Sequence, residues 1–197
     1  SGNLYFNQKK FEQAIGYYRQ FQKDYKDHKQ IPFAMFQEGQ SLYRLEYYSD
    51  AVDVWVKMAD KFEENPLAEK ARFQSARTLF DLGETTGSVK AFQTVLVKYP
   101  NSENAKEARL QLAHAYYNAG DYKNAIPKYQ EFLALYPNSE EAVKVQDFLQ
   151  IAYVQSGMSE AEIAQLTLGQ AKTQVLADLY WEKGAKAYNE KNYETSL

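Results

Sequence analysis

Cysteine and histidine, two side chains that often carry catalysis or bind metals, are sparse in this 197-residue sequence. It has no cysteine, which excludes disulfides, thiolate metal sites and a cysteine nucleophile. Its two histidines, His28 and His114, are far apart in the chain, and His28 lies in a polar run where solvation is expected. The stretch Gly83–Gly87 lacks the lysine of a phosphate-binding loop, and no His-Glu-x-x-His motif occurs. The sequence therefore predicts a protein that is not an enzyme and that needs no cofactor and no metal.

The composition limits the possible partners. The chain is 45% hydrophobic and 25% charged, as in ordinary globular proteins, and its net charge is −3. No broad cationic field is available to hold a phosphate backbone, so nucleic acid is not an expected partner. The longest stretch without a charge, Phe148–Ser159, is shorter than the roughly 18 apolar residues that span a bilayer. The 197 residues are therefore not expected to insert into a membrane. The expected partner is a protein or a peptide.

The chain repeats its residue types every 37 positions. Ala14, Ala51, Ser88 and Ala125 each follow the previous one by 37 residues. The same step links two sets of aromatic residues: Tyr18, Trp55, Phe92 and Tyr129, and Tyr25, Phe62, Tyr99 and Tyr136. So many size-matched positions in one register indicate an array of structural repeats.

Each repeat is predicted to be a pair of helices. Apolar residues in 105–119 recur every three or four positions, as on one helix face, and Gly120 follows as a helix stop. A second amphipathic stretch covers 122–136, and Pro137 ends it. Further start and stop signals are Asn65 before Pro66, Gly83, Gly157, and the capping-box spacing of Ser159 and Glu162. Strand-type alternation is absent, so the predicted fold class is all-α, built from helix–turn–helix repeats.

The repeat resembles the tetratricopeptide family, whose period is about 34 residues. The family pattern is supplied in order by Ala113, Tyr116, Ala125, Tyr129 and Pro137. The resemblance implies a right-handed superhelix, an α-solenoid. Two departures from the family pattern resemble its bacterial cell-envelope subgroup: the three extra residues, and large side chains where the family usually has a small one. Members of this subgroup are of the outer-membrane assembly lipoprotein and periplasmic cell-division coordinator type. The resemblance to this subgroup implies a location in the periplasm or at the outer membrane, with the cytoplasm as the alternative.

The array is regular in one part of the chain and irregular in the other. Residues 1–157 are predicted to form a regular array whose first repeat is truncated, because Ser1 aligns with Glu38, halfway through a first helix. Residues 158–197 are predicted to be irregular, truncated repeats of the same array. The stretch 158–173 is read as a drifted repeat, with a hinge between two superhelical blocks as the alternative.

The resemblance also implies a binding surface, because the first helices of tetratricopeptide repeats line a concave groove. Carried over by register, the expected partner-binding residues are Phe36, Gln40, Tyr43, Arg44, Lys70, Phe73, Arg77, Phe80, Asp81, Leu110, His114, Tyr117 and Asn118. Glu107 lies at the entrance of its helix. The alternative for the rings is that they only fill gaps between neighbouring first helices. Arg77 and His114 are harder to place in a core, and an unperturbed histidine would add mild pH sensitivity.

Two functions remain open from the sequence. The first is a non-catalytic scaffold that binds a protein or peptide segment in the concave groove. The second is a structural spacer or self-association module without a groove ligand, in which exposed helix faces or the ends of the array make the contacts.

Overall fold

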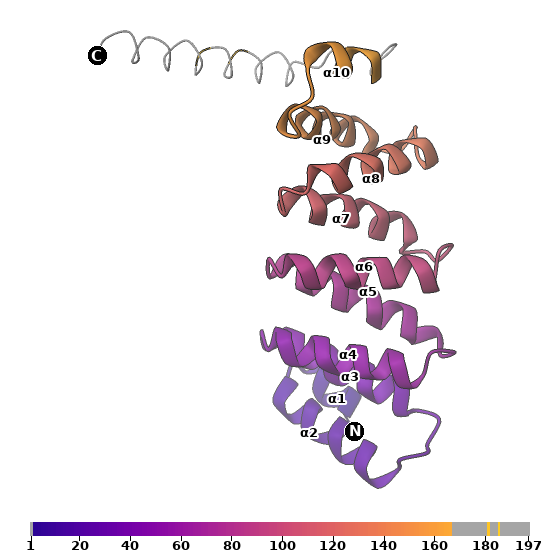
Figure 1. Cartoon of the computed structure of the whole chain (residues 1–197). Helices are drawn as coiled ribbons and strands as arrows, with labels where there is room; N and C mark the ends of the chain where they lie inside the picture. The colour runs from indigo at the N-terminus through magenta and orange to yellow at the C-terminus, as the bar shows by residue number, and fades with distance from the viewer. Residues whose placement is uncertain (1, 167–180, 182–184, 186–197) are drawn as a thin grey trace, which may run out of the picture. The chain divides into compact units, whose positions relative to one another are not determined.

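The computed structural model describes residues 2–166, 181 and 185, and its elements are all α-helices (Figure 1). In chain order they are α1 (Gly2–Asn7), α2 (Phe11–Asp24), α3 (Ile31–Arg44), α4 (Tyr48–Lys61), α5 (Pro66–Asp81), α6 (Thr85–Lys98), α7 (Ala105–Asn118), α8 (Tyr122–Leu135), α9 (Ala142–Gln155) and α10 (Glu160–Leu166). No strand occurs among these residues. The predicted all-α fold of helical pairs is confirmed.

The second helix of each repeat keeps the 37-residue register in space as well as in sequence. The helices α2, α4, α6 and α8 begin at Phe11, Tyr48, Thr85 and Tyr122, and each is 14 residues long. The helices predicted over 105–119 and 122–136 are α7 and α8, each ending one residue earlier than expected.

The chain divides into two compact units, residues 1–115 and 116–197, with the boundary inside α7. In the first unit, each helix from α1 to α6 packs against its neighbours in the sequence, and α3 also contacts α5. In the second unit, α8 packs on α9, and α9 on α10. The irregular repeats expected beyond residue 166 lie outside the described residues, apart from residues 181 and 185.

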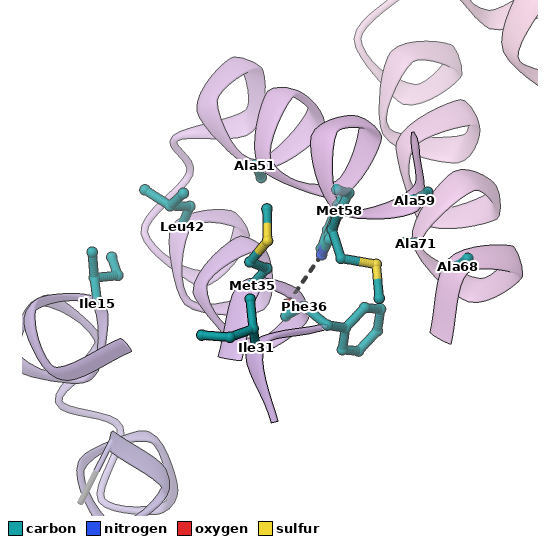
Figure 2. Packing of buried hydrophobic residues seen from close by; sticks show 11 residues of the cluster. Ile15, Ile31, Met35, Phe36, Leu42, Ala51, Met58, Ala59, Ala68 and Ala71 are labelled. Atoms are coloured by element: carbon teal, nitrogen blue, oxygen red, sulfur yellow. Dashed lines mark hydrogen bonds between the residues drawn. The ribbon is translucent and has the colours of Figure 1, made fainter. Parts of the chain in front are cut away.

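The core of the first unit is built around Trp55, whose side chain is completely buried. Its indole N–H donates a hydrogen bond to the carbonyl oxygen of Phe36 at 3.1 Å, so the polar tip of the ring is satisfied inside the core (Figure 2). Met35 and Met58 lie beside it between α3 and α4. Ala68 and Ala71 of the following first helix, α5, belong to the same cluster, so this core joins one repeat to the next.

Gly39 faces Trp55 across the helix pair. A Cβ atom at Gly39 would lie 2.3 Å from Nε1 and 2.6 Å from Cδ1 of the indole, closer than real contacts allow. The equivalent residues one repeat later are Ala76 and Phe92, both fully buried. The larger ring is thus matched with the residue that has no side chain.

The connection inside each repeat ends the first helix with one residue in the left-handed conformation. Gly83, Gly120 and Gly157 have φ values of 74°, 70° and 87°, as expected for helix stops. Lys9 and Glu46 occupy the same register position with φ values of 59° and 64°. Residue type does not reveal these two positions, because neither is a glycine. The backbone there is strained by the Cβ atom.

The predicted caps are also present. The side chain of Asn65 accepts a hydrogen bond from the amide of Leu67 at 2.9 Å, immediately ahead of Pro66. The amide of Ser159 donates to the Glu162 carboxylate at 2.8 Å, and the Glu162 amide donates back to Ser159 Oγ at 3.3 Å. The Ser159 hydroxyl also donates to this carboxylate at 2.7 Å. The hydrogen bonds from the Ser159 hydroxyl and from the Ser159 amide lower the pKa of the Glu162 carboxyl.

We predict that Gly39→Ala destabilises the protein by about 1–3 kcal/mol, the usual range for overpacking a core. The matched control is Gly16→Ala in α2, where a Cβ would meet no atom within 4 Å and should stabilise by about 0.5–1 kcal/mol. Urea unfolding of each variant measures both. The double variant Gly39→Ala/Trp55→Phe, which copies the Ala76–Phe92 pair, should be less destabilised than the two single changes summed. Simple additivity would contradict a direct clash.

A second prediction concerns the left-handed connection. Glu46→Gly should raise the free energy of unfolding by about 0.5–1 kcal/mol, because relief of the left-handed strain exceeds the extra entropy that glycine gives the unfolded chain. Gly83→Ala, the reverse change one repeat later, should lower it by about 1 kcal/mol. If the urea unfolding midpoint shifted in the same direction in both variants, this account would be contradicted.

Candidate protein-binding face

Two neighbouring first helices present equivalent side chains on one surface of the first unit. Gln40, Tyr43 and Arg44 are three and four positions apart on α3, so they share a helix face. Their equivalents on α5 are Arg77, Phe80 and Asp81. Because α3 contacts α5, the two sets lie next to each other. We call these six residues, with Lys70 and Glu107, the first-helix face.

Two of the predicted rings do not belong to this surface. Phe36 and Phe73 are only 6% and 4% exposed. Their ring centroids lie 6.4 Å from that of Trp55 and 6.3 Å from that of Phe92. They pack between the two helices of their own repeat, because their position on the first helix faces the buried ring of the second. The alternative had placed them between neighbouring first helices.

Tyr43 and Phe80 are half-buried rings at the edge of the same cores. The Tyr43 ring centroid lies 6.0 Å from that of Trp55 and 5.2 Å from that of Tyr48. The Phe80 ring centroid lies 6.4 Å from that of Phe92. Each ring is therefore held by packing on one side while part of it remains on the first-helix face.

Charged groups surround these rings. Arg77 Nη1 lies 3.5 Å from Glu107 Oε1 at the start of α7, and their side chains are 52% and 43% exposed. Arg44 and Asp81 are also exposed. The ammonium of Lys70 lies 5.8 Å from the centre of the Phe36 ring, a cation–π distance. The position of Glu107 at the entrance of its helix was expected from the register, whereas its pairing with Arg77 was not predicted.

Leu110 and His114 lie further along α7 and are half-buried. Burial lowers the pKa of the His114 imidazole from its ordinary value of 6.5. The folded protein therefore favours the neutral form of His114 more than it would for an unperturbed histidine.

Tyr117 and Asn118 belong to the second unit. The Tyr117 ring packs among Tyr122, Tyr129 and Phe148, with ring centroids 5.5, 6.2 and 5.4 Å away. Burial raises the pKa of the Tyr117 hydroxyl. Asn118 is exposed at the end of α7. Within its own unit, Tyr117 resembles Tyr43 and Phe80: a ring supported by the core of its repeat.

Within the described part of the chain, no three histidine, aspartate or glutamate side chains come together as metal ligands. Over the same residues, no helix has the length and apolarity to cross a bilayer.

Comparison with known protein families finds two matches. The family of the outer membrane lipoprotein YfiO matches residues 65–174, and a tetratricopeptide-repeat family matches residues 1–28. No curated protein matches the sequence.

Solved structures with the same fold include a tetratricopeptide repeat protein from Parabacteroides merdae, with 16% identity and a TM-score of 0.67, covering 98% of this chain and 75% of that one. A MamA structure has 15% identity and a TM-score of 0.62, with 95% and 96% of the two chains covered. MamA from Desulfovibrio magneticus has 19% identity and a TM-score of 0.57, with 87% and 97% covered. These similarities show a tetratricopeptide-type solenoid, a fold used in general by protein-interaction scaffolds.

The burial of His114 predicts a pH dependence of stability. Because its pKa is lowered in the folded state, the unfolded chain binds a proton more readily. The contribution of His114 to stability is therefore complete above the unfolded pKa near 6.5 and is lost as the pH falls below that value. Urea unfolding between pH 7.5 and 5.5 should show a smaller loss of stability in His114→Gln than in the wild type. Equal losses in the two proteins would contradict the assignment.

Proposed function

Because the chain belongs to the family of the outer membrane lipoprotein YfiO, we propose that it is a non-catalytic, protein-binding module of a bacterial cell-envelope protein. The proposed binding surface is the first-helix face. Its proposed occupant is an extended protein segment that carries an acidic or hydrogen-bonding group between apolar residues.

The observation that carries this proposal is the combination of supported rings with a weakly paired cation. Tyr43 and Phe80 are fixed by their packing on Trp55 and Phe92, so little side-chain entropy is lost when a partner covers them. Arg77 is half-exposed, and its distance of 3.5 Å from Glu107 is typical of a surface ion pair, which contributes about 1 kcal/mol or less.

A bound segment would use these groups in different ways. Its apolar side chains would cover Tyr43 and Phe80 and supply most of the affinity, since aromatic residues dominate binding energy at interfaces. Its acidic group would take the place of Glu107 beside Arg77 and set the orientation of the segment. Gln40, one repeat before Arg77, would contribute a hydrogen-bonding amide in the same row.

We predict that Arg77→Ala lowers the affinity for the partner at least tenfold, equivalent to about 1.4 kcal/mol. The partner would first be captured from an envelope extract through a photo-crosslinking residue in place of Gln40, then purified and titrated by calorimetry. Glu107→Gln should raise the affinity by up to about fivefold, because it releases Arg77. Lys23→Ala, at an exposed residue of α2, is the control and should bind like the wild type.

Unchanged affinity in Arg77→Ala, with its helicity and melting temperature intact, would place the contact elsewhere and favour the spacer or self-association module. Light scattering separates that alternative. A concentration-dependent dimer that forms without any partner and is unaffected by Arg77→Ala would support it.

A further inference from the structure

A cavity of about 260 Å³ opens between the second helices α4 and α6, alongside α5. It is lined by Val56 of α4, Arg72 and Ser75 of α5, and Lys90, Ala91 and Thr94 of α6, together with Gly87. Ser75 and Arg77 are two residues apart on one helix, which places them about 200° apart around its axis. The cavity therefore lies on the side of α5 that faces away from the first-helix face.

The repeat register explains why this cavity is open. The residue equivalent to Ser75 is Glu38 one repeat earlier and Leu112 one repeat later, and both are buried. Glu38 accepts hydrogen bonds from Arg19 Nε at 2.6 Å and Gln22 Nε2 at 2.7 Å, so side chains fill the corresponding space there. Val56, equivalent to Arg19, is too short to do the same. The small side chain of Ser75 leaves this space open.

The cavity is lined by cationic and apolar groups. The Arg72 side chain is only 9% exposed, and its Nη2 donates to Asp60 Oδ1 at 2.6 Å. Within the described part of the chain, its buried Nε has no hydrogen-bond acceptor. Lys90 is exposed at the rim, and no carboxylate of the described residues forms an ion pair with it. The Arg72 Nε is shielded from solvent, so a bound group would contact the guanidinium through its other nitrogens.

The hydroxyl groups of Ser75 and Thr94 already donate hydrogen bonds within their own helices. Ser75 Oγ donates to the carbonyl oxygen of Ala71 at 2.8 Å, and Thr94 Oγ1 donates to that of Lys90 at 2.8 Å. Asp60 and Glu63, which lie beside the Arg72 guanidinium, are more than half exposed, so water screens their charges. The donors left for a bound group are those of Arg72 and Lys90, and the rest of the lining, Val56 and Ala91, is apolar.

We propose that this cavity is a binding site for a carboxylate on a short apolar chain, and that its occupant is the acidic side chain of a partner protein. The volume is smaller than the roughly 300–1,000 Å³ of sites for drug-sized ligands and suits a single side chain. The carboxylate would accept from Arg72 and Lys90, while its methylene groups would contact Val56 and Ala91. This site is separate from the first-helix face and does not depend on it.

The test is an NMR titration of the whole chain with two capped tetrapeptides, acetyl-Ala-Leu-Glu-Ala-amide and its Gln counterpart, and with 4-methylpentanoate and 4-methylpentanamide. The Glu peptide should cause saturable shifts at the backbone amides of Ser75, Ala91 and Thr94, and the Gln peptide should bind at least tenfold more weakly. Equal binding of the Glu and Gln peptides, or no binding, would overturn the carboxylate site. Binding of 4-methylpentanoate without the Glu peptide would overturn the protein segment as occupant.

Two variants show whether the cavity itself is responsible. Ser75→Leu copies the neighbouring Leu112, fills the space and should abolish the shifts. Lys90→Ala, at the exposed rim, should weaken binding severalfold and keeps the test valid if Ser75→Leu does not fold. Lys23→Ala and Arg77→Ala, which are remote from the cavity, should leave the titration unchanged. Full binding by both Ser75→Leu and Lys90→Ala would overturn the proposal.

Discussion

The packing of one large ring from each second helix against a small residue of the first helix is the contact on which the rest of the structure depends. Trp55 over Gly39 is the most demanding case, because the indole occupies the space of a side chain and also donates to the carbonyl of Phe36. This contact brings α3 and α4 together closely enough for Ala68 and Ala71 of the next repeat to join the same core. In the first unit, this apolar cluster therefore extends from Ile15 of α2 to Ala71 of α5 and links neighbouring repeats.

The same core determines which rings reach the surface. Phe36 and Phe73 point into it, whereas Tyr43 and Phe80, two turns further along their helices, lie at its edge. A ring held on one side by Trp55 or Phe92 keeps its orientation without a partner. The first-helix face therefore carries rings that the core holds in place, with the exposed Arg77–Glu107 ion pair beside them.

One position on the opposite side of the first helices changes its residue type from repeat to repeat. At one register position the chain places Glu38, Ser75 and Leu112, which are an ion-paired carboxylate, a small hydroxyl and an apolar side chain. The backbone register tolerates all three because this position lies between the second helices and not under the buried ring. In the repeat that has a serine at this position, a cavity opens beside Ser75 and Arg72.

The repeat length, the pairing of helices, the caps and the buried rings of the second helices follow from the sequence alone, because these depend on local spacing and on side-chain size. Asn65, Gly120 and the Ser159–Glu162 box could be predicted since each acts within a few residues of its own backbone. Only the tertiary structure decided that Phe36 is buried, that Arg77 meets Glu107, and that Glu46 adopts a left-handed backbone. These outcomes depend on how far one helix is rotated and shifted against the next, a matter of a few ångströms that residue type and spacing leave open.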